Sequence, residues 1–205
     1  MDLDAQARAI EAVQVKAPDA YGQSGFHGDA ERWEALRRPC VAGVDKDGTY
    51  LDIGCANGVL LECAAKWSAQ AGHRIEPFGL DHSQALAAMA RTRLGVGADR
   101  IFVGDALKWE PPRRFDYVRT ELVYVPGAQR RPYIERLASE FLAPQGRLIV
   151  ASYGSRGGVP AAERVGDLLR EWGFSVEGEA EAKDTLSDKT LTRVAWVAPR
   201  HRAPE

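Results

Sequence analysis

A short apolar segment that ends in a glycine-containing turn and passes directly into a helical pattern constrains the fold of this chain most. The segment is residues 49–58, TYLDIGCANG, and apolar side chains recur at helical spacing over residues 59–67. A strand, a tight turn and a helix in this order form the first half of a βαβ unit. In open α/β sheets, ligands bind at such turns, outside the carboxyl ends of the strands. The sequence therefore predicts an α/β fold with a ligand site at this turn.

The two glycines of the turn, Gly54 and Gly58, suit close contact with a ligand. Each can adopt a positive φ, and neither has a Cβ that would keep a ligand away from the backbone. We expect exposed N–H groups at the start of the helix, where they favour electronegative ligand atoms. On this stretch alone, a plain β–α connection with glycines used only for turning is the alternative.

The spacing of the glycines argues against two common nucleotide-binding motifs. A dinucleotide fingerprint has the form G-x-G-x-x-G. Aligned on Gly54, its second and third glycines would be Ala56 and Val59, so the fingerprint fails twice. A phosphate-binding loop of the G-x-x-x-x-G-K-S/T type also fails, because the chain contains no Gly-Lys pair.

Residues 51–58 resemble the first motif of the class I S-adenosylmethionine-dependent methyltransferases. In that family an acidic residue ends the first strand and glycines follow at alternate positions; here the positions are Asp52, Gly54, Ala56 and Gly58. Alanine departs from the commonest form at the middle position, and we expect it to be tolerated if its φ stays negative. Together with Cys55, these residues are the predicted turn of the cofactor site.

The resemblance covers residues 48–198 and implies an α/β, doubly wound fold. The expected sheet has seven strands, is mostly parallel with the order 3-2-1-4-5-7-6 and an antiparallel last strand, and has helices on both faces. We predict an N-terminal helical or lid segment over residues 1–47, the S-adenosylmethionine-binding domain over residues 48–198 and a disordered tail over residues 199–205.

Within the N-terminal segment, residues 17–38 form either a lid over the cofactor or a helix packed against the sheet edge. The candidates for lid contacts are Tyr21, Phe26, His27 and Trp33.

Acidic residues at the ends of the second and third predicted strands are the next candidates for ligand contacts. Asp81 lies about 20 residues beyond the glycine turn, where a carboxylate bonds a ribose diol. The resemblance implies that Asp105 accepts a hydrogen bond from the adenine amine, and that His82 and Ala106 line the adenine pocket. Alternatively, Asp81 is only an acidic residue at the start of the next helix, and Asp105 only forms an ordinary Asx turn.

The fourth predicted strand, residues 115–121, ends beside the expected methyl-donor end of the cofactor. Glu121 is the candidate to contact the cofactor there, and to remove a proton from a nucleophile or pair with a cationic substrate. Tyr124 is the candidate to orient that substrate. The alternative is that Glu121 only positions the loop. His27 is the third catalytic candidate.

Composition limits the partners and the compartment. The net charge of −2 argues against a strongly basic nucleic-acid-binding protein. The three cysteines form no C-x-x-C pair, so we expect neither a disulfide framework nor a metal site, and a reducing cytoplasm fits. No apolar run is long enough to span a membrane.

These observations favour an S-adenosylmethionine-dependent methyltransferase that acts on an oxygen or nitrogen nucleophile and releases S-adenosylhomocysteine. A small-molecule acceptor is favoured over RNA or protein, and a monomer or homodimer is expected. The alternatives from other classes are an NAD-dependent oxidoreductase and a catalytically silent nucleoside-binding module.

Overall fold

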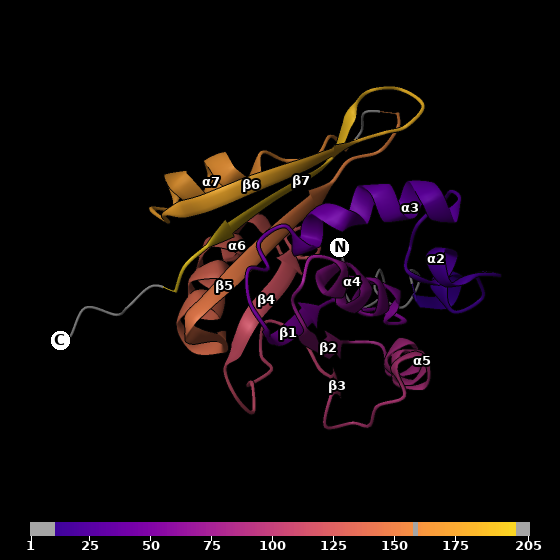
Figure 1. Ribbon diagram of the computed structural model, residues 1–205, viewed down its shortest axis with the longest axis horizontal. Coiled ribbons are helices and arrows are strands. Elements are labelled where there is room, and N and C mark those ends of the chain that lie inside the picture. Colours follow the sequence, from indigo (N-terminus) through magenta and orange to yellow (C-terminus); the bar gives the residue numbers. More distant parts are fainter. Residues whose placement is uncertain (1–10, 158–159, 200–205) are drawn as a thin grey trace.

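The computed structural model describes residues 11–157 and 160–199, which form a seven-stranded sheet between two helical layers (Figure 1). The strand order is β3-β2-β1-β4-β5-β7-β6, with β7 antiparallel to both β5 and β6 and the other pairs parallel. The predicted sheet is therefore confirmed. In chain order the strands are β1 Gly48–Ile53, β2 Ile75–Asp81, β3 Ile101–Val103, β4 Phe115–Glu121, β5 Leu142–Tyr153, β6 Val176–Lys183 and β7 Thr190–Val197.

Helices connect these strands and precede the first of them. Their starts follow local capping chemistry: the Asp29 carboxylate accepts from the Arg32 N–H, and the Ser83 hydroxyl accepts from the Leu86 N–H. The helical elements are α2 Ala20–Gln23, α3 Ala30–Arg37, η1 Arg38–Val41, α4 Val59–Gln70, α5 Gln84–Leu94, α6 Gly127–Arg136, η2 Leu137–Phe141 and α7 Val165–Glu171.

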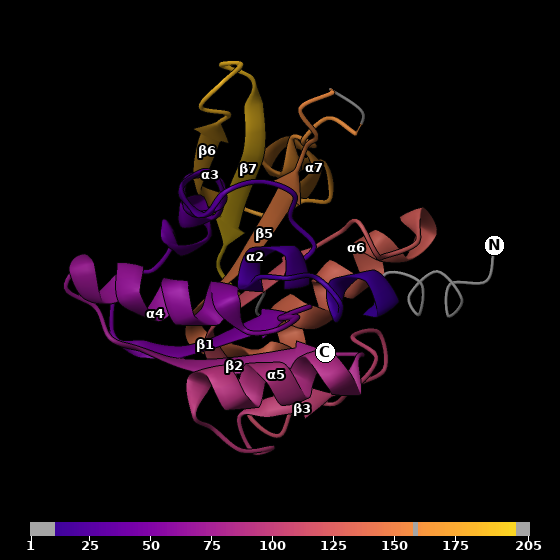
Figure 2. The same cartoon turned by 90° about the vertical axis from the view of Figure 1, so that its right-hand side faces the viewer.

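The alternation of side chains along β1 decides what each face of the sheet contacts. Leu51 and Ile53 belong to the core shared with α6, η2 and α7, whereas Tyr50 belongs to the core shared with α3, α4 and α5. In Figure 2, α3 and α4 lie on one side of β5 and α6 on the other. Asp52 is two residues after Tyr50, so its side chain is placed on the same face as α3 and α4.

The N-terminal segment packs on the sheet through α3. Trp33 is 1% exposed and lies between the rings of Tyr21 and Trp67, at centroid distances of 5.2 and 6.2 Å. The Thr192 hydroxyl of β7 donates to the Leu36 carbonyl of α3. Trp33 is therefore a core residue, and the prediction that it makes lid contacts is wrong.

Two predictions reach beyond the described residues. The predicted N-terminal segment, residues 1–47, is described only from residue 11, and residues 11–14 are helical. The predicted disordered tail lies outside the described residues from residue 200 onward. The division of the chain into three segments stays a prediction.

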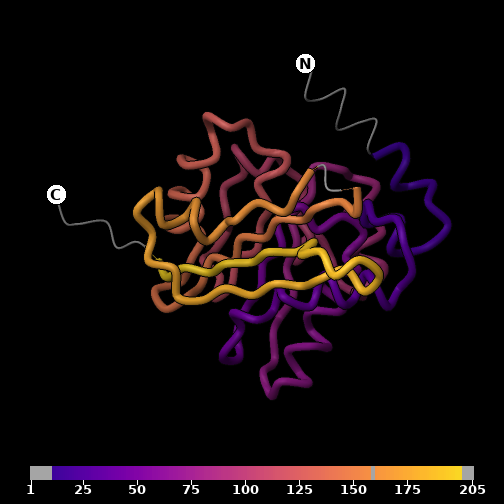
Figure 3. The backbone as a smooth tube through the Cα atoms, turned by 90° about the horizontal axis from the view of Figure 1, so that it is seen from above, coloured from indigo at the N-terminus to yellow at the C-terminus, as the bar shows by residue number. Residues whose placement is uncertain are grey.

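The β6–β7 hairpin runs along one edge of the sheet (Figure 3) and depends on a glycine. Gly178 on β6 lies opposite Trp196 on β7. A Cβ on Gly178 would lie 2.1 Å from Cζ2 of the Trp196 ring, which real carbon atoms do not tolerate. The indole therefore fills the space that a side chain on Gly178 would need.

Replacing this glycine tests the packing of the hairpin. We expect Gly178→Ala to lower the free energy of unfolding by about 1–3 kcal/mol, because the added methyl group must displace the Trp196 ring. Urea denaturation followed by circular dichroism measures the change. The matched control is Gly127→Ala, where a Cβ would meet nothing within 4 Å. Equal stabilities for the two variants would contradict the packing described.

Candidate cofactor and catalytic site

The glycine turn between β1 and α4 is held in place by bonds to β2. Gly54 and Gly58 have φ values of 81° and 78°, as the sequence predicts. The N–H groups of Gly54 and Cys55 both donate to the Leu80 carbonyl, and the Gly58 N–H donates to the Cys55 carbonyl. The expectation of exposed N–H groups at the start of the helix is wrong for Gly58 and Val59, because Gly58 donates to the Cys55 carbonyl and Val59 donates to Oδ1 of Asn57.

Ala56 does not keep the negative φ on which its tolerance was expected to depend, since its φ is +46°. A left-handed backbone costs an alanine about 1–2 kcal/mol. The Ala56 N–H donates to Oδ2 of Asp81 at 2.8 Å, and this bond holds the residue in place. The Cys55 side chain is buried in the core, whereas a Cβ added to Gly54 would meet open space.

Asp81 is a buried carboxylate whose position is fixed by backbone donors. It is 6% exposed; its Oδ1 accepts from the Ser83 N–H at 2.9 Å and its Oδ2 from the Ala56 N–H at 2.8 Å. Burial raises the pKa of Asp81, and these two N–H groups oppose that rise. Nδ1 of His82 lies 3.6 Å from Oδ1. Each carboxylate oxygen keeps a further lone pair, so Asp81 can accept hydrogen bonds from a ligand.

Two contacts that the sequence did not indicate attach the N-terminal segment to this site. The Ser83 hydroxyl donates to Oε1 of Glu11 at 2.7 Å. Nδ2 of the buried Asn57 donates to the Ala20 carbonyl and to Oε1 of Gln23, both in α2. Thus α2 lies against the glycine turn while α3 packs on the sheet, and the lid role of residues 17–38 stays a prediction.

Asp105 follows β3 at the same edge of the sheet. Val103 pairs with Asp81 across β2 and β3, so Asp105 comes two residues later on the neighbouring strand. Its Oδ1 accepts from the Leu107 N–H at 2.9 Å, which confirms the Asx turn. The side chain is half exposed, and the Ala106 N–H has no hydrogen bond within the described part of the chain. The adenine contacts of Asp105 and Ala106 stay predictions.

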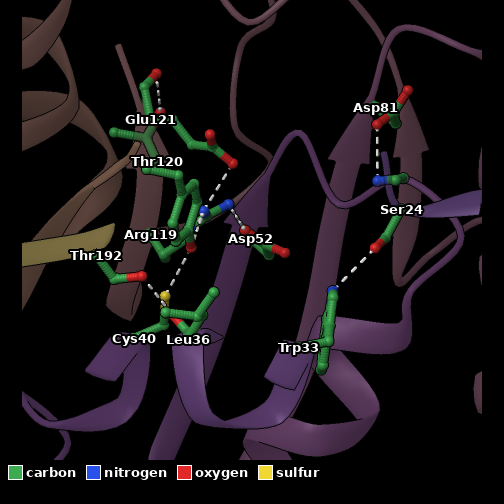
Figure 4. A network of polar contacts seen from close by, with 12 residues as sticks. Ser24, Trp33, Leu36, Cys40, Asp52, Asp81, Arg119, Thr120, Glu121 and Thr192 are labelled. Atoms are coloured by element: carbon green, nitrogen blue, oxygen red, sulfur yellow. Dashed lines mark hydrogen bonds and ion pairs between the residues drawn. The ribbon is translucent and has the colours of Figure 1, made fainter. Parts of the chain in front are cut away.

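A buried arginine that the sequence analysis missed joins the ends of β1, β4 and β5 (Figure 4). Arg119 lies directly opposite Asp52 in the β1–β4 register and is 1% exposed. Its Nη1 donates to Oδ1 of Asp52 at 3.0 Å, and its Nη2 donates at 2.7 Å to both Oε1 of Glu121 and the hydroxyl of Tyr153. The Glu121 side chain is 21% exposed, so it has one ion-paired side and one open side.

The electrostatics of this cluster leave one carboxylate oxygen without a donor. Burial raises the pKa of Asp52 to about 6, and the positive charge of Arg119 opposes the rise. Within the described residues, Oδ2 of Asp52 and Nε of Arg119 are buried without a hydrogen-bond partner. An unsatisfied buried polar atom costs about 1–3 kcal/mol. Oδ2 of Asp52 can therefore accept a hydrogen bond from a ligand.

Within the described residues, two of the catalytic candidates form no hydrogen bond with this cluster through their side chains. His27 is exposed, and its backbone carbonyl accepts from Nη1 of Arg32. Tyr124 is 64% exposed. Neither side chain has a hydrogen bond within the described residues. The structure thus joins Asp52 to Glu121 through Arg119, and it joins Asp81 to the glycine turn. The catalytic roles of His27, Tyr124 and Glu121 stay predictions.

Comparison with solved structures identifies the fold. The N-methyltransferase NodS from Bradyrhizobium japonicum, solved in complex with S-adenosylhomocysteine, superposes with a TM-score of 0.65 at 18% identity, over 95% of this chain and 98% of that one. The chain has the class I S-adenosylmethionine-dependent methyltransferase fold.

Two further structures have this methyltransferase fold at similar divergence. A methyltransferase from Leishmania major gives a TM-score of 0.65 at 16% identity, covering 93% of this chain and 82% of that one. A methyltransferase from Geobacter sulfurreducens, in complex with S-adenosylhomocysteine, gives a TM-score of 0.61 at 19% identity, covering 94% of this chain and 98% of that one. No family model and no curated protein sequence matches the chain.

Two structural features are absent from the described residues. None of the helices there combines the length and the apolar character needed to cross a membrane. Nor do those residues contain a group of three or more His, Cys, Asp or Glu side chains arranged to hold a metal ion.

Removal of the buried arginine tests the electrostatic account of the site. We expect Arg119→Met to lower the free energy of unfolding by about 3–5 kcal/mol, because it leaves buried carboxylates without a counter-charge. Arg119 lowers the pKa of Asp52, so that pKa rises further in the variant. When the pKa of a carboxyl is higher in the folded than in the unfolded protein, ionising that carboxyl destabilises the fold. This destabilisation is fully present above the folded-state pKa and is lost as the pH falls through that pKa.

The loss of unfolding free energy in Arg119→Met relative to wild type should therefore be larger at pH about 7.5 than at pH about 5. Urea denaturation at both pH values measures it. The matched control is Arg131→Met, whose exposed ion pair with Glu135 is expected to contribute about 0–1 kcal/mol. A deficit that does not change with pH would contradict the account.

Proposed function

We propose that the chain is an S-adenosylmethionine-dependent methyltransferase that transfers a methyl group to an oxygen or nitrogen nucleophile of a small molecule. The observation that supports this most is the pair of buried carboxylates at the ends of neighbouring strands, Asp52 on β1 and Asp81 on β2, on either side of the glycine turn. Both carboxylates have acceptor capacity that the protein does not use.

The residues present fit the cofactor. Asp81 would accept from the ribose hydroxyls, and Oδ2 of Asp52 would accept from the ammonium group of the methionine part. The backbone from Gly54 through Cys55 and Ala56 to Gly58 would lie against the cofactor, with the open space beside Gly54 available to it.

The adenine end would be held by residues that follow β2 and β3. His82, Asp105 and Ala106 would surround the base, with the second oxygen of Asp105 and the Ala106 N–H as its polar contacts. At the other end, Glu121 would lie beside the methionine part.

S-adenosylmethionine, when bound, supplies a methyl group already activated by the positive charge on sulfur. The protein then has to hold the acceptor in line with that methyl group and exclude water, and proximity of this kind contributes most of the acceleration. A general base is required only for an acceptor that is protonated at the working pH. Glu121, through its open side, is the first candidate, Tyr124 would orient the acceptor, and His27 is the alternative base.

The alternatives differ in what supports them. An acceptor in RNA or protein gains no support from the net charge of −2. An NAD-dependent oxidoreductase would require the dinucleotide fingerprint that fails at Ala56 and Val59. A silent nucleoside-binding module would bind the cofactor but show no methyl transfer from tritiated S-adenosylmethionine to any acceptor pool.

Substitution of the ribose-binding candidate tests the proposal. We expect Asp81→Asn to weaken S-adenosylhomocysteine binding roughly tenfold or more, the effect of a lost hydrogen bond to a charged group. Isothermal titration calorimetry measures the affinity, and thermal unfolding shows whether the variant is folded. The control is Asp167→Asn, a half-exposed aspartate on α7. Unchanged affinity in a folded Asp81→Asn protein would refute the ribose role.

A further inference from the structure

Arg37 is the last residue of α3, and its guanidinium packs against aromatic rings. The group lies over the ring of Tyr153 at 3.5 Å from its centroid, and 5.6 Å from the centroid of the Phe26 ring. The residue is partly buried. Within the described residues, its guanidinium has neither an ion pair nor a hydrogen bond. A partly desolvated cation without an anion is unfavourable unless a ligand supplies the anion.

The arginines around Arg37 are committed to carboxylates of the protein. Arg32 and Arg156 both pair with the buried Asp184, and Arg119 pairs with Asp52 and Glu121. Within the described residues, none of these carboxylates forms an ion pair with Arg37.

Arg37 lies on the acceptor side of the proposed site. Tyr153, which it covers, is at the carboxyl end of β5, and the Tyr153 hydroxyl accepts from the same Arg119 nitrogen that bonds Glu121. Tyr153 and Arg119 thus connect Arg37 to Glu121.

The proposed donor contacts lie on other strands. Apart from Glu121 on β4, the residues that would hold the cofactor are at the ends of β1, β2 and β3, and β4 separates these strands from β5 in the sheet. In Figure 1, α3 lies near β5 and β7, whereas α5 lies beside β2 and β3. A ligand group that meets Arg37 is thus displaced from the glycine turn toward the β5 side of the edge.

We infer that Arg37 binds a carboxylate of the methyl acceptor, and that the substrate is a small carboxylic acid. The inference rests on the proposed methyltransferase function. A guanidinium stacked by its face on Tyr153 keeps its N–H donors free in its own plane, and two of them match the oxygens of one planar carboxylate. The exposed side chains of Val123 and Tyr124, in the loop after β4, offer apolar surface to the rest of such an acid.

Arg37→Gln, with Arg38→Gln as the matched control, tests the inference. Arg38 is the next residue in the chain, but it donates to Oε1 of Gln70 and lies over Trp67, away from Tyr153. Calorimetry measures S-adenosylhomocysteine binding by each protein. Saturation-transfer NMR then measures binding of a set of aromatic and short aliphatic carboxylic acids and of their primary amides to the S-adenosylhomocysteine-loaded proteins.

We expect wild type and Arg38→Gln to bind acids of this set in preference to the amides. Arg37→Gln should bind the acids roughly tenfold or more weakly, as expected for a lost charge-assisted contact, with S-adenosylhomocysteine affinity within about twofold of wild type. Arg37→Lys keeps the positive charge but not the planar pair of N–H donors, so it should bind the acids more tightly than Arg37→Gln and less tightly than wild type. Thermal unfolding confirms that each variant is folded.

Three results would overturn the inference. A tenfold loss of S-adenosylhomocysteine affinity in Arg37→Gln would assign Arg37 to the donor's own carboxylate. Acids that bind no better than amides to wild type, or equally well to Arg37→Gln, would show that Arg37 selects no acid. Failure of wild type to bind S-adenosylhomocysteine would refute the proposed function instead, and the acid and amide titrations of the unliganded protein would still decide the role of Arg37.

Discussion

The ion pair between Arg119 and Asp52 is the interaction on which the candidate site depends. It joins adjacent strands at a point where both side chains are 1% exposed, so neither charge is screened by water. The same guanidinium also bonds Glu121 and Tyr153, and the Tyr153 hydroxyl lies 3.0 Å from the Cys40 thiol in η1. One buried cation thereby fixes the ends of β1, β4 and β5 and the element that leads into β1.

This arrangement favours ligand recognition by carboxylates over recognition by the amides of the glycine turn. The N–H groups of Gly54, Cys55, Ala56 and Gly58 donate to Leu80, Asp81 and Cys55. What remains for a ligand is the free acceptor capacity of Asp52 and Asp81 and the open space beside Gly54. A ligand with hydroxyl and ammonium donors suits these groups, whereas a phosphate does not, because two buried carboxylates would repel it.

The sequence was sufficient for the fold because its signals are local. The strand, turn and helix at residues 49–67, and an acid at or just after the end of each of the next three strands, set the order of the elements, and the resemblance supplied the sheet order. Arg119 escaped prediction because its importance depends on register: only the pairing of β1 with β4 places it opposite Asp52. In the sequence it is merely a charged residue inside an apolar strand.

Other errors have equally specific causes. The positive φ of Ala56 is imposed by its bond to Asp81, 25 residues away, which overrides the local preference of alanine. Contacts such as Glu11 with Ser83 join segments 72 residues apart, and no spacing pattern in the chain indicates them.

The most direct test of the central claim, that the ends of β1, β2 and β3 form one adenosyl-binding edge, is amide NMR of the isotope-labelled chain titrated with S-adenosylhomocysteine. The account predicts that the perturbed amides cluster at Gly54–Gly58, at His82 and Ser83, and at Asp105–Leu107, with saturation at a single affinity. Perturbations that fall elsewhere, or that appear at these residues with NADH and not with S-adenosylhomocysteine, would contradict it.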